Sequence, residues 1–203
     1  MNSGQISDRV YGVLRARLME RGYVPGQRLD PALLADDLAS SVTPVRDALH
    51  RLTGENLVAT RPSEGFFVPS MDQIGLADLL NWSIDIIKAA ITAALPGWNA
   101  EARGAWPTAA LAHARATLDL FDQIVAGSGN VEHRNASAQA QARLAPAYQV
   151  ECALIEDVGE EMLAIAAAAS AADGPRLKRL IDRYRRRRVR LGADIVRLLY
   201  RPA

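Results

Sequence analysis

Alanine is distributed very unevenly along this chain of 203 residues, and the change falls close to residue 70. Residues 1–70 contain 6 alanines, whereas residues 71–203 contain 30. Because alanine has the highest intrinsic helix propensity, we expect the second part to be all helical. The sequence therefore predicts two domains, residues 1–70 and residues 71–203, that differ in architecture.

Residues 1–70 show three helical segments followed by a hairpin. Apolar residues recur with a helical period over about residues 7–21, and two shorter helices follow, the second of which begins near Ser41. Apolar runs at 57–60 and 66–69 flank a turn that contains proline, serine and glycine, which is typical of a β-hairpin. Because the second and third helices are separated by only about four residues, this order predicts a winged helix-turn-helix.

Residues 25–68 contain several short motifs in a fixed order. They are Pro25-Gly26, Leu34-Ala35, SVTPVRDAL at 41–49, Leu57-Val58 and GFFV at 65–68. In this order and spacing the segment resembles the GntR family of bacterial transcription regulators. The resemblance implies a winged helix that binds DNA through its third helix. The segment departs from the family pattern at Ser40, Val42 and Asn56, where a valine, an arginine and a glycine are usual.

The candidate DNA contacts lie at the start of the third helix and on the wing. A recognition helix enters the major groove with its amino end first, and the free N–H groups there favour a phosphate. Val42 can contact a thymine methyl group, while Arg61 suits a backbone contact. For Arg46, His50 and Arg51 the alternative is a solvated helix surface. The candidate DNA-binding residues are Ser41, Val42, Thr43, Pro44, Arg46, His50, Arg61 and Gly65.

Residues 71–203 predict an all-α bundle, so the fold class is mostly α. In length and helix count this part resembles the FadR C-terminal type of the GntR family, which implies effector binding and dimerisation. A kink near Pro146 is expected where two of the helices join. The expected helices span about 72–95, 107–126, 132–149 and 150–171, and a long final helix follows the Asp173-Gly174-Pro175 turn and runs to about residue 200.

In that type an Asp-x3-His pair and two later histidines hold a metal in the ligand pocket. The matching positions here carry neither an aspartate nor a histidine. They fall on Asn135 and Gln139, and near Met162 and Tyr184. The three histidines of the chain have no spacing suited to a shared site. We therefore expect no metal and no other cofactor.

The effector itself is not identified by the sequence. Candidates for a polar pocket are Asn135, Gln139, Arg143 and Tyr184, and the alternative is that they are exposed or structural. Trp82, Trp98 and Trp106 could line an apolar pocket, or pack in the core or in a dimer interface. Cys152 lies in an apolar run and is expected to be a buried small hydrophobic residue.

Charge is also distributed unevenly, although 24 basic and 23 acidic residues nearly cancel. Residues 1–70 have 8 of each sign, residues 71–175 have 5 basic and 13 acidic, and residues 176–203 have 11 basic and 2 acidic. The run from Arg185 to Arg188 could contact a DNA backbone, or pair with the acidic helices before it. We expect the basic last helix to pack on the acidic helices, within one chain or across a dimer.

The chain contains no nucleophile elbow, P-loop, paired histidines or dinucleotide-binding motif, so we expect it not to be an enzyme. The sequence predicts a homodimeric, effector-responsive transcription regulator, such as a repressor, on a pseudo-palindromic DNA operator. The alternative is a winged-helix interaction module that has lost DNA binding, which the neutral first 70 residues favour. With one cysteine, no signal-peptide core and no long apolar run, a cytoplasmic protein without a membrane partner is expected.

Overall fold

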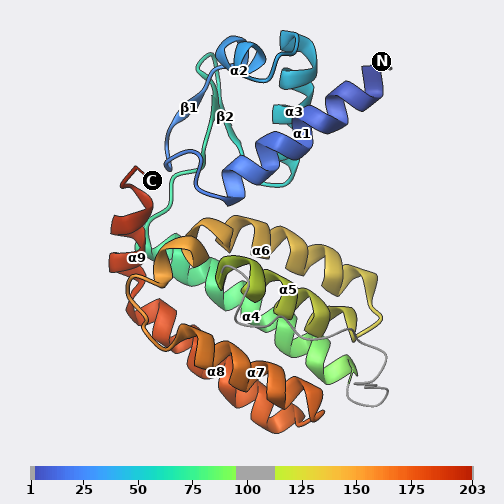
Figure 1. Ribbon diagram of the computed structural model, residues 1–203, viewed down its shortest axis with the longest axis vertical. Helices are drawn as coiled ribbons and strands as arrows, with labels where there is room; N and C mark the ends of the chain where they lie inside the picture. The colour runs from blue at the N-terminus through green and yellow to red at the C-terminus, as the bar shows by residue number, and fades with distance from the viewer. Residues whose placement is uncertain (1–2, 95–112, 203) are drawn as a thin grey trace. The chain divides into compact units, whose positions relative to one another are not determined.

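The computed structural model describes residues 3–94 and 113–202 (Figure 1). The chain divides into two compact units, one of Met1–Met71 with Leu199–Ala203 and the other of Asp72–Leu198. The first unit is a winged helix-turn-helix and the second is helical, which confirms the expected mostly α fold class.

The first unit combines three helices with a small sheet. The strand order is β1-β3-β2, and both pairings are antiparallel. Strand β1 was not predicted, because two residues are too few to show an alternating pattern. The elements are α1 (Ser3–Met19), β1 (Arg28–Leu29), α2 (Pro31–Asp37), α3 (Val42–Gly54), β2 (Ala59–Arg61) and β3 (Gly65–Phe67).

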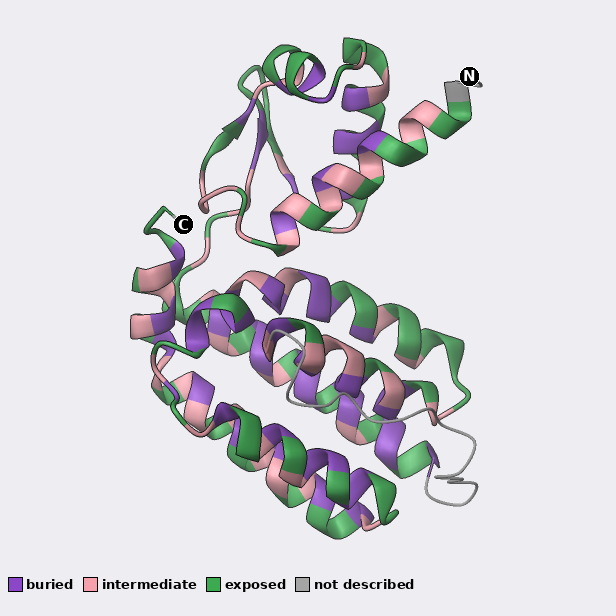
Figure 2. Ribbon diagram, in the orientation of Figure 1, coloured by how far each residue is buried: buried purple, intermediate pink, exposed green. Residues whose placement is uncertain are grey.

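The core of the first unit forms where α1, α2 and α3 meet. Val10 and Leu14 on α1, and Leu49 on α3, are at most 1% exposed, and Figure 2 shows these helices alternating between buried and exposed positions. Helix α2 begins at Asp30, whose side chain accepts hydrogen bonds from two backbone N–H groups of the first turn. The turn between α2 and α3 is therefore fixed by buried residues on both sides.

Asn56 lies directly after the C-cap residue Glu55 of α3, in the turn that leads to the wing. Its φ is +58°, in the left-handed region that asparagine tolerates better than most residues. The N–H of Leu57 then donates a hydrogen bond to the carbonyl of Leu52 at 3.0 Å. Asparagine thus preserves the turn into the wing.

The second unit is a bundle of helices. Helix α4 packs against α5, α6 and α8, while α7 packs against α5 and α8, and Figure 1 shows α7 and α8 side by side. The elements are α4 (Gln73–Ala94), α5 (His113–Ala126), α6 (Val131–Glu151), α7 (Val158–Ser170), α8 (Gly174–Arg190) and α9 (Gly192–Leu199).

Two expected helix boundaries are wrong. Helix α6 continues through Pro146 to Glu151, and α7 begins only at Val158, so the expected helix over 150–171 starts too early. The expected final helix is divided at Leu191, where α8 ends. A β-carbon at residue 192 would lie 3.3 Å from Cγ of Gln73, so a glycine allows this close approach. Residues 107–112 of another expected helix lie outside the described residues.

Candidate nucleic-acid interface

The amino end of α3 is open to solvent. Ser41 occupies the N-cap position with extended backbone angles, φ −86° and ψ 164°, but its side chain makes no capping hydrogen bond. Val42 is 38% exposed, and Ser41 and Thr43 are also exposed. Pro44 is half-buried in the first turn, where no backbone N–H is needed. The first turn of α3 therefore presents hydroxyl groups and N–H groups to an incoming anion.

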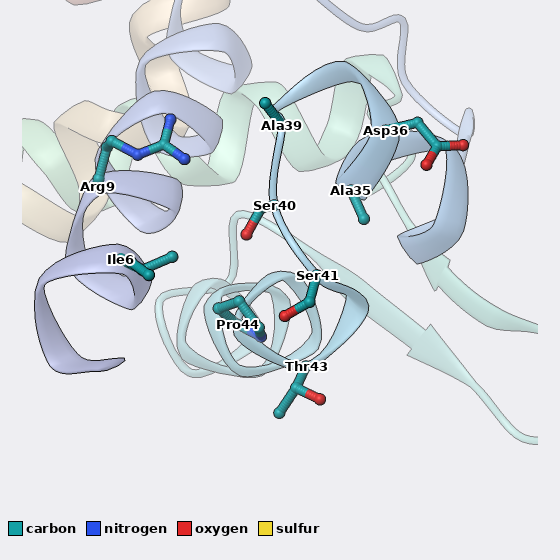
Figure 3. Close-up of a pocket in the computed structure, with 9 residues that line it drawn as sticks. All are labelled: Ile6, Arg9, Ala35, Asp36, Ala39, Ser40, Ser41, Thr43 and Pro44. Atoms are coloured by element: carbon teal, nitrogen blue, oxygen red, sulfur yellow. The ribbon is translucent and has the colours of Figure 1, made fainter. Parts of the chain in front are cut away.

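A pocket of about 890 Å³ lies beside this end of α3. Figure 3 shows that α1 forms one side of it, through Ile6 and Arg9, and that the turn between α2 and α3 forms the other. The Arg9 guanidinium donates a hydrogen bond to the Leu38 carbonyl at 3.1 Å. The Ser40 hydroxyl is buried without a hydrogen-bond partner among the described residues. The sequence analysis missed this pocket, because its walls come from three separate segments.

Arg46 and Arg51 differ in what they contact, although both are exposed on α3. Arg51 pairs with Asp8 at 2.8 Å and lies over the Tyr11 ring, 4.0 Å from its centroid. Arg46 makes no ion pair or side-chain hydrogen bond within the described part of the chain. Of the two, Arg46 is the one that remains available to a ligand.

The wing fixes Arg61 opposite Gly65 in the β2–β3 register. Gly65 has φ +98°, which strongly favours glycine. Arg61 is exposed, lies 3.5 Å from Glu64, and covers the Phe67 ring at 4.3 Å from its centroid. The His50 ring, also exposed, packs edge-on against a wing phenylalanine at a centroid distance of 4.9 Å. All eight sequence-predicted DNA-binding residues thus lie on α3 or the wing.

The four predicted effector residues do not share one environment. Asn135 and Gln139 are exposed on α6, and Arg143 is half-buried. Tyr184 on α8 is fully buried. The buried polar positions of α6 are Ser137, Gln141 and Glu151. Because two residues correspond to about 200° around a helix, Asn135 and Gln139 lie on the opposite side from Ser137 and Gln141.

Two groups of buried polar side chains occupy the interior of the second unit. In the first, the Gln141 side-chain amide donates to the Ser83 hydroxyl at 3.0 Å, and the Tyr148 hydroxyl donates to Gln141 at 2.7 Å. Burial, followed by the Glu151 charge, raises the pKa of Tyr148 above its usual range. Tyr148 is therefore a neutral hydrogen-bond donor at physiological pH.

The second group surrounds Arg188, which is 1% exposed. Its guanidinium donates to both carboxylate oxygens of Glu151 at 2.7 and 2.9 Å, and to Glu161 at 2.7 Å. His113 contacts the same Glu151 carboxylate through Nε2. Burial opposes the charged form of Arg188, but the neighbouring acidic groups outweigh it and raise the pKa of the guanidinium. Sequence reasoning missed this group because its members come from α5, α6, α7 and α8.

Three buried polar atoms close to these groups lack a well-formed hydrogen bond within the described residues. They are Oγ of Ser137, Oε1 of Glu161 and the hydroxyl of Tyr184. The Arg188 guanidinium lies over the Tyr184 ring, 3.4 Å from its centroid, and the Tyr148 hydroxyl is the polar group that interacts with that of Tyr184. Because a buried polar atom without a partner is costly, each of these atoms would be stabilised by a further hydrogen bond.

These side chains do not fit a divalent metal. Met162 and Tyr184, near which the two later ligand positions fall, are both buried, and neither is a usual ligand of a divalent metal. Within residues 3–94 and 113–202, no three His, Cys, Asp or Glu side chains form a group that could hold a metal ion.

The arginine run on α8 is mostly engaged within the second unit. Arg185 donates to Asn81 at 2.8 Å, and Arg187 pairs with Asp157. Together with buried Arg188, these contacts agree with pairing inside the helical domain. Arg186 is exposed.

Two further side chains differ from expectation. Cys152 is exposed, so its assignment as a buried residue is wrong, because the helix ends there and the chain turns toward α7. Partial burial and the Glu151 charge still raise the pKa of its thiol. Trp82 is 55% exposed and therefore does not pack in the core of its own unit. Trp98 and Trp106 lie outside the described residues.

Comparison with known proteins gives matches to the first part of the sequence. Residues 6–68 match the family of bacterial regulatory proteins named gntR. The transcriptional regulator McbR of Escherichia coli K12 is 33% identical over 69 residues, which are 33% of this chain and 31% of McbR. The Nta operon transcriptional regulator of Aminobacter aminovorans is 42% identical over 55 residues, which are 27% of this chain and 26% of that protein. The matched segment thus spans about a third or less of each curated relative.

Solved structures match the fold over nearly the whole chain. E. coli McbR/YncC gives a TM-score of 0.70 at 20% identity, covering 99% of this chain and 100% of that chain. A GntR regulator structure from Rhodococcus sp. RHA1 gives 0.67 at 20% identity, covering 94% and 97%. At this identity the similarity establishes the fold alone.

No helix in the described residues is long and apolar enough to span a bilayer.

Proposed function

We propose that this chain, whose residues 6–68 form a helix-turn-helix domain of the gntR family, is a DNA-binding transcription regulator and not an enzyme. The observation that carries the proposal is the open amino end of α3. Ser41, Thr43 and Arg46 are exposed there, and none of their side chains is used by an ion pair or hydrogen bond among the described residues. A surface of this kind has polar groups ready for a ligand.

The contacts divide between backbone and bases. A DNA phosphate at the start of α3 accepts hydrogen bonds from the first-turn N–H groups and from the Ser41 hydroxyl. Arg46, one turn further along, reaches the base edges of the major groove, and Val42 contacts a thymine methyl group. The wing adds a backbone contact through Arg61, where Gly65 permits a close approach.

The regulator acts as a homodimer on a pseudo-palindromic operator. Two recognition helices placed about 34 Å apart would read two half-sites one helical turn apart. What supports self-association is the outer face of α4, where Ile74 is 73% exposed and Trp82 is 55% exposed. Large exposed apolar residues of this kind are typical of protein interfaces.

A small effector binds in the interior of the second unit. The unpartnered atoms of Ser137 and Glu161 support this site, and of the four residues first considered Tyr184 is the one that is fully buried in that interior. Because both glutamates already neutralise Arg188, the site suits a neutral or donor-bearing polar molecule. Binding would shift the population of DNA-competent arrangements.

An electrophoretic shift of the DNA upstream of the gene, with full-length protein, tests the proposal. The wild type should retard this DNA at low salt, and Arg46→Ala should weaken the complex. Arg134→Ala, which removes an exposed arginine from α6, is the matched control and should bind as the wild type does. If the wild type does not retard this DNA, the alternative is favoured, namely an interaction module that does not bind DNA. The balance of 8 basic and 8 acidic residues in segment 1–70 agrees with that alternative.

A further inference from the structure

Five arginines form a stripe along the outer face of α8. Successive members are three or four residues apart, a spacing that places them on one side of a helix. All five are exposed. Because a helix rises about 1.5 Å per residue, their 14-residue span corresponds to roughly 21 Å. The stripe consists of Arg176, Arg179, Arg183, Arg186 and Arg190.

The stripe is not neutralised by neighbouring acidic residues. Within the described residues its side chains make no ion pair or hydrogen bond, and Arg183 adds only a longer-range attraction to Asp157, which already pairs with Arg187. Asp182 is the single acidic residue in the sequence of α8, and Lys88 pairs with it at 3.1 Å.

The other basic side chains of α8 contrast with the stripe. Lys178 donates to Thr92 at 2.7 Å, and Arg185 donates to Asn81 at 2.8 Å. Arg187 pairs with Asp157, and Arg188 is buried between two glutamates. The basic side chains on one side of α8 therefore contact other residues of the second unit, whereas the arginine stripe carries positive charge that no acidic side chain neutralises.

We infer that the arginine stripe binds the sugar-phosphate backbone of double-stranded DNA, as a contact that does not depend on sequence; this rests on the proposed function. The guanidinium group matches phosphate geometry and stays charged at any physiological pH. Because each strand has one phosphate for about every 3.4 Å of the duplex axis, a stripe of roughly 21 Å is long enough to meet several phosphates.

The charge distribution supports this role for the second unit. Residues 1–70 carry 8 basic and 8 acidic residues, so the winged helix has no net charge. Most of the non-specific affinity of a DNA-binding protein comes from basic side chains that displace counterions. In this chain the uncompensated arginines of α8 can supply that electrostatic affinity.

The stripe fits other partners less well. No large apolar side chain is exposed on α8, whereas a helix that lies in a membrane surface buries an apolar face. The core of a stable protein interface is likewise depleted in charged residues and needs apolar or aromatic groups. A solvent-exposed polyanion can be bound without a buried apolar face and without an apolar interface core.

The test measures binding of full-length protein to a fluorescent duplex of scrambled sequence over a series of salt concentrations. The stripe variant is Arg179→Ala/Arg186→Ala. The control variant, Arg115→Ala/Arg134→Ala, removes the same charge from exposed positions of α5 and α6. The stripe variant should bind more weakly at low salt, and its slope of log K against log salt should become shallower by about two per chain. The control variant and Arg179→Lys/Arg186→Lys should keep the wild-type slope.

Three results would overturn the inference. One is a stripe variant with the wild-type salt slope while Arg46→Ala still impairs operator binding, because the proposed function would then stand without the stripe. Another is unchanged DNA binding with loss of binding to phosphatidylserine vesicles, which would assign the stripe to a lipid surface. The third is unchanged DNA binding with loss of self-association in sedimentation. If the wild type binds no DNA, the proposed function itself fails.

Discussion

Arg46 and Arg51 lie five residues apart on α3, and their surroundings separate a ligand-binding role from a structural one. Arg51 is held by Asp8 and by the Tyr11 ring, whereas Arg46 has no such contact within the described residues. The sequence alone could not distinguish them, because Asp8 lies 43 positions away from Arg51. Motif spacing did identify Arg46, since its position follows from the start of the helix.

Arg51→Ala should therefore leave DNA affinity close to that of the wild type and lower stability only slightly. Exposed ion pairs contribute little to stability. Thermal unfolding and binding to the same duplex check this pair of effects. A loss of DNA affinity as large as that of Arg46→Ala would place Arg51 in the interface.

Ser40→Val should stabilise the first unit. The Ser40 hydroxyl is buried without a partner among the described residues. Replacing an unsatisfied hydroxyl by a methyl group should raise the free energy of unfolding by about 1 kcal/mol. Denaturant unfolding measures the change, with Ser70→Val at an exposed position as control. A destabilised Ser40→Val protein would show that the hydroxyl is bonded, for example to water.

At the scale of elements, the short helices and the hairpin could be predicted because their signals are local. Asp30, Ser41 and Gly65 each mark a boundary through their own chemistry. The break at Leu191 could not be predicted, because it depends on the approach of Gln73 from α4. The start of α7 at Val158 could not be predicted for a similar reason. Asp157, the residue before it, pairs with Arg187 of α8.

The pair of Asp157 and Arg187 joins the start of α7 to α8 and should make stability depend on acid pH. The hydrogen bond from Arg187 lowers the pKa of Asp157. A carboxylate with a lowered folded-state pKa adds stability above its unfolded value, about 3.9, which is lost as the pH falls through the folded value. The difference in melting temperature between wild type and Asp157→Asn should therefore be present at neutral pH and shrink below about pH 4. A difference that grows on acidification would contradict the pairing.

The buried ionic group around Arg188 connects four helices, and Arg188→Met should destabilise the second unit strongly. Removing the arginine leaves Glu151 and Glu161 buried without their partner. Breaking a buried pair in this way costs about 3–5 kcal/mol. Arg190→Met, on the exposed side of the same helix, is the control and should unfold as the wild type does. Equal stability of the two variants would show that the interior charges are not coupled.

At the scale of the whole molecule, charge and function are divided between the two units. Residues 1–70, with 8 basic and 8 acidic residues, provide a few well-placed contacts, and the second unit provides a polar interior and the arginine stripe. The candidate effector residues Asn135 and Gln139 on α6 are exposed, and the buried polar residues Ser137 and Gln141 lie two positions further along. The sequence could not distinguish these two sides of α6, because the segment is polar and rich in alanine and has no clear apolar face. The net charge of the chain did not indicate the stripe either, because only the structure shows which arginines form ion pairs.

The measurement that tests the central claim most directly is the ratio of affinities for the operator and for a scrambled duplex, in wild type and Arg46→Ala. If the amino end of α3 reads DNA sequence, the substitution should reduce this ratio by about 5- to 150-fold, which corresponds to roughly 1–3 kcal/mol of base discrimination. A ratio that stays the same in Arg46→Ala would contradict the account, because sequence would then be read elsewhere.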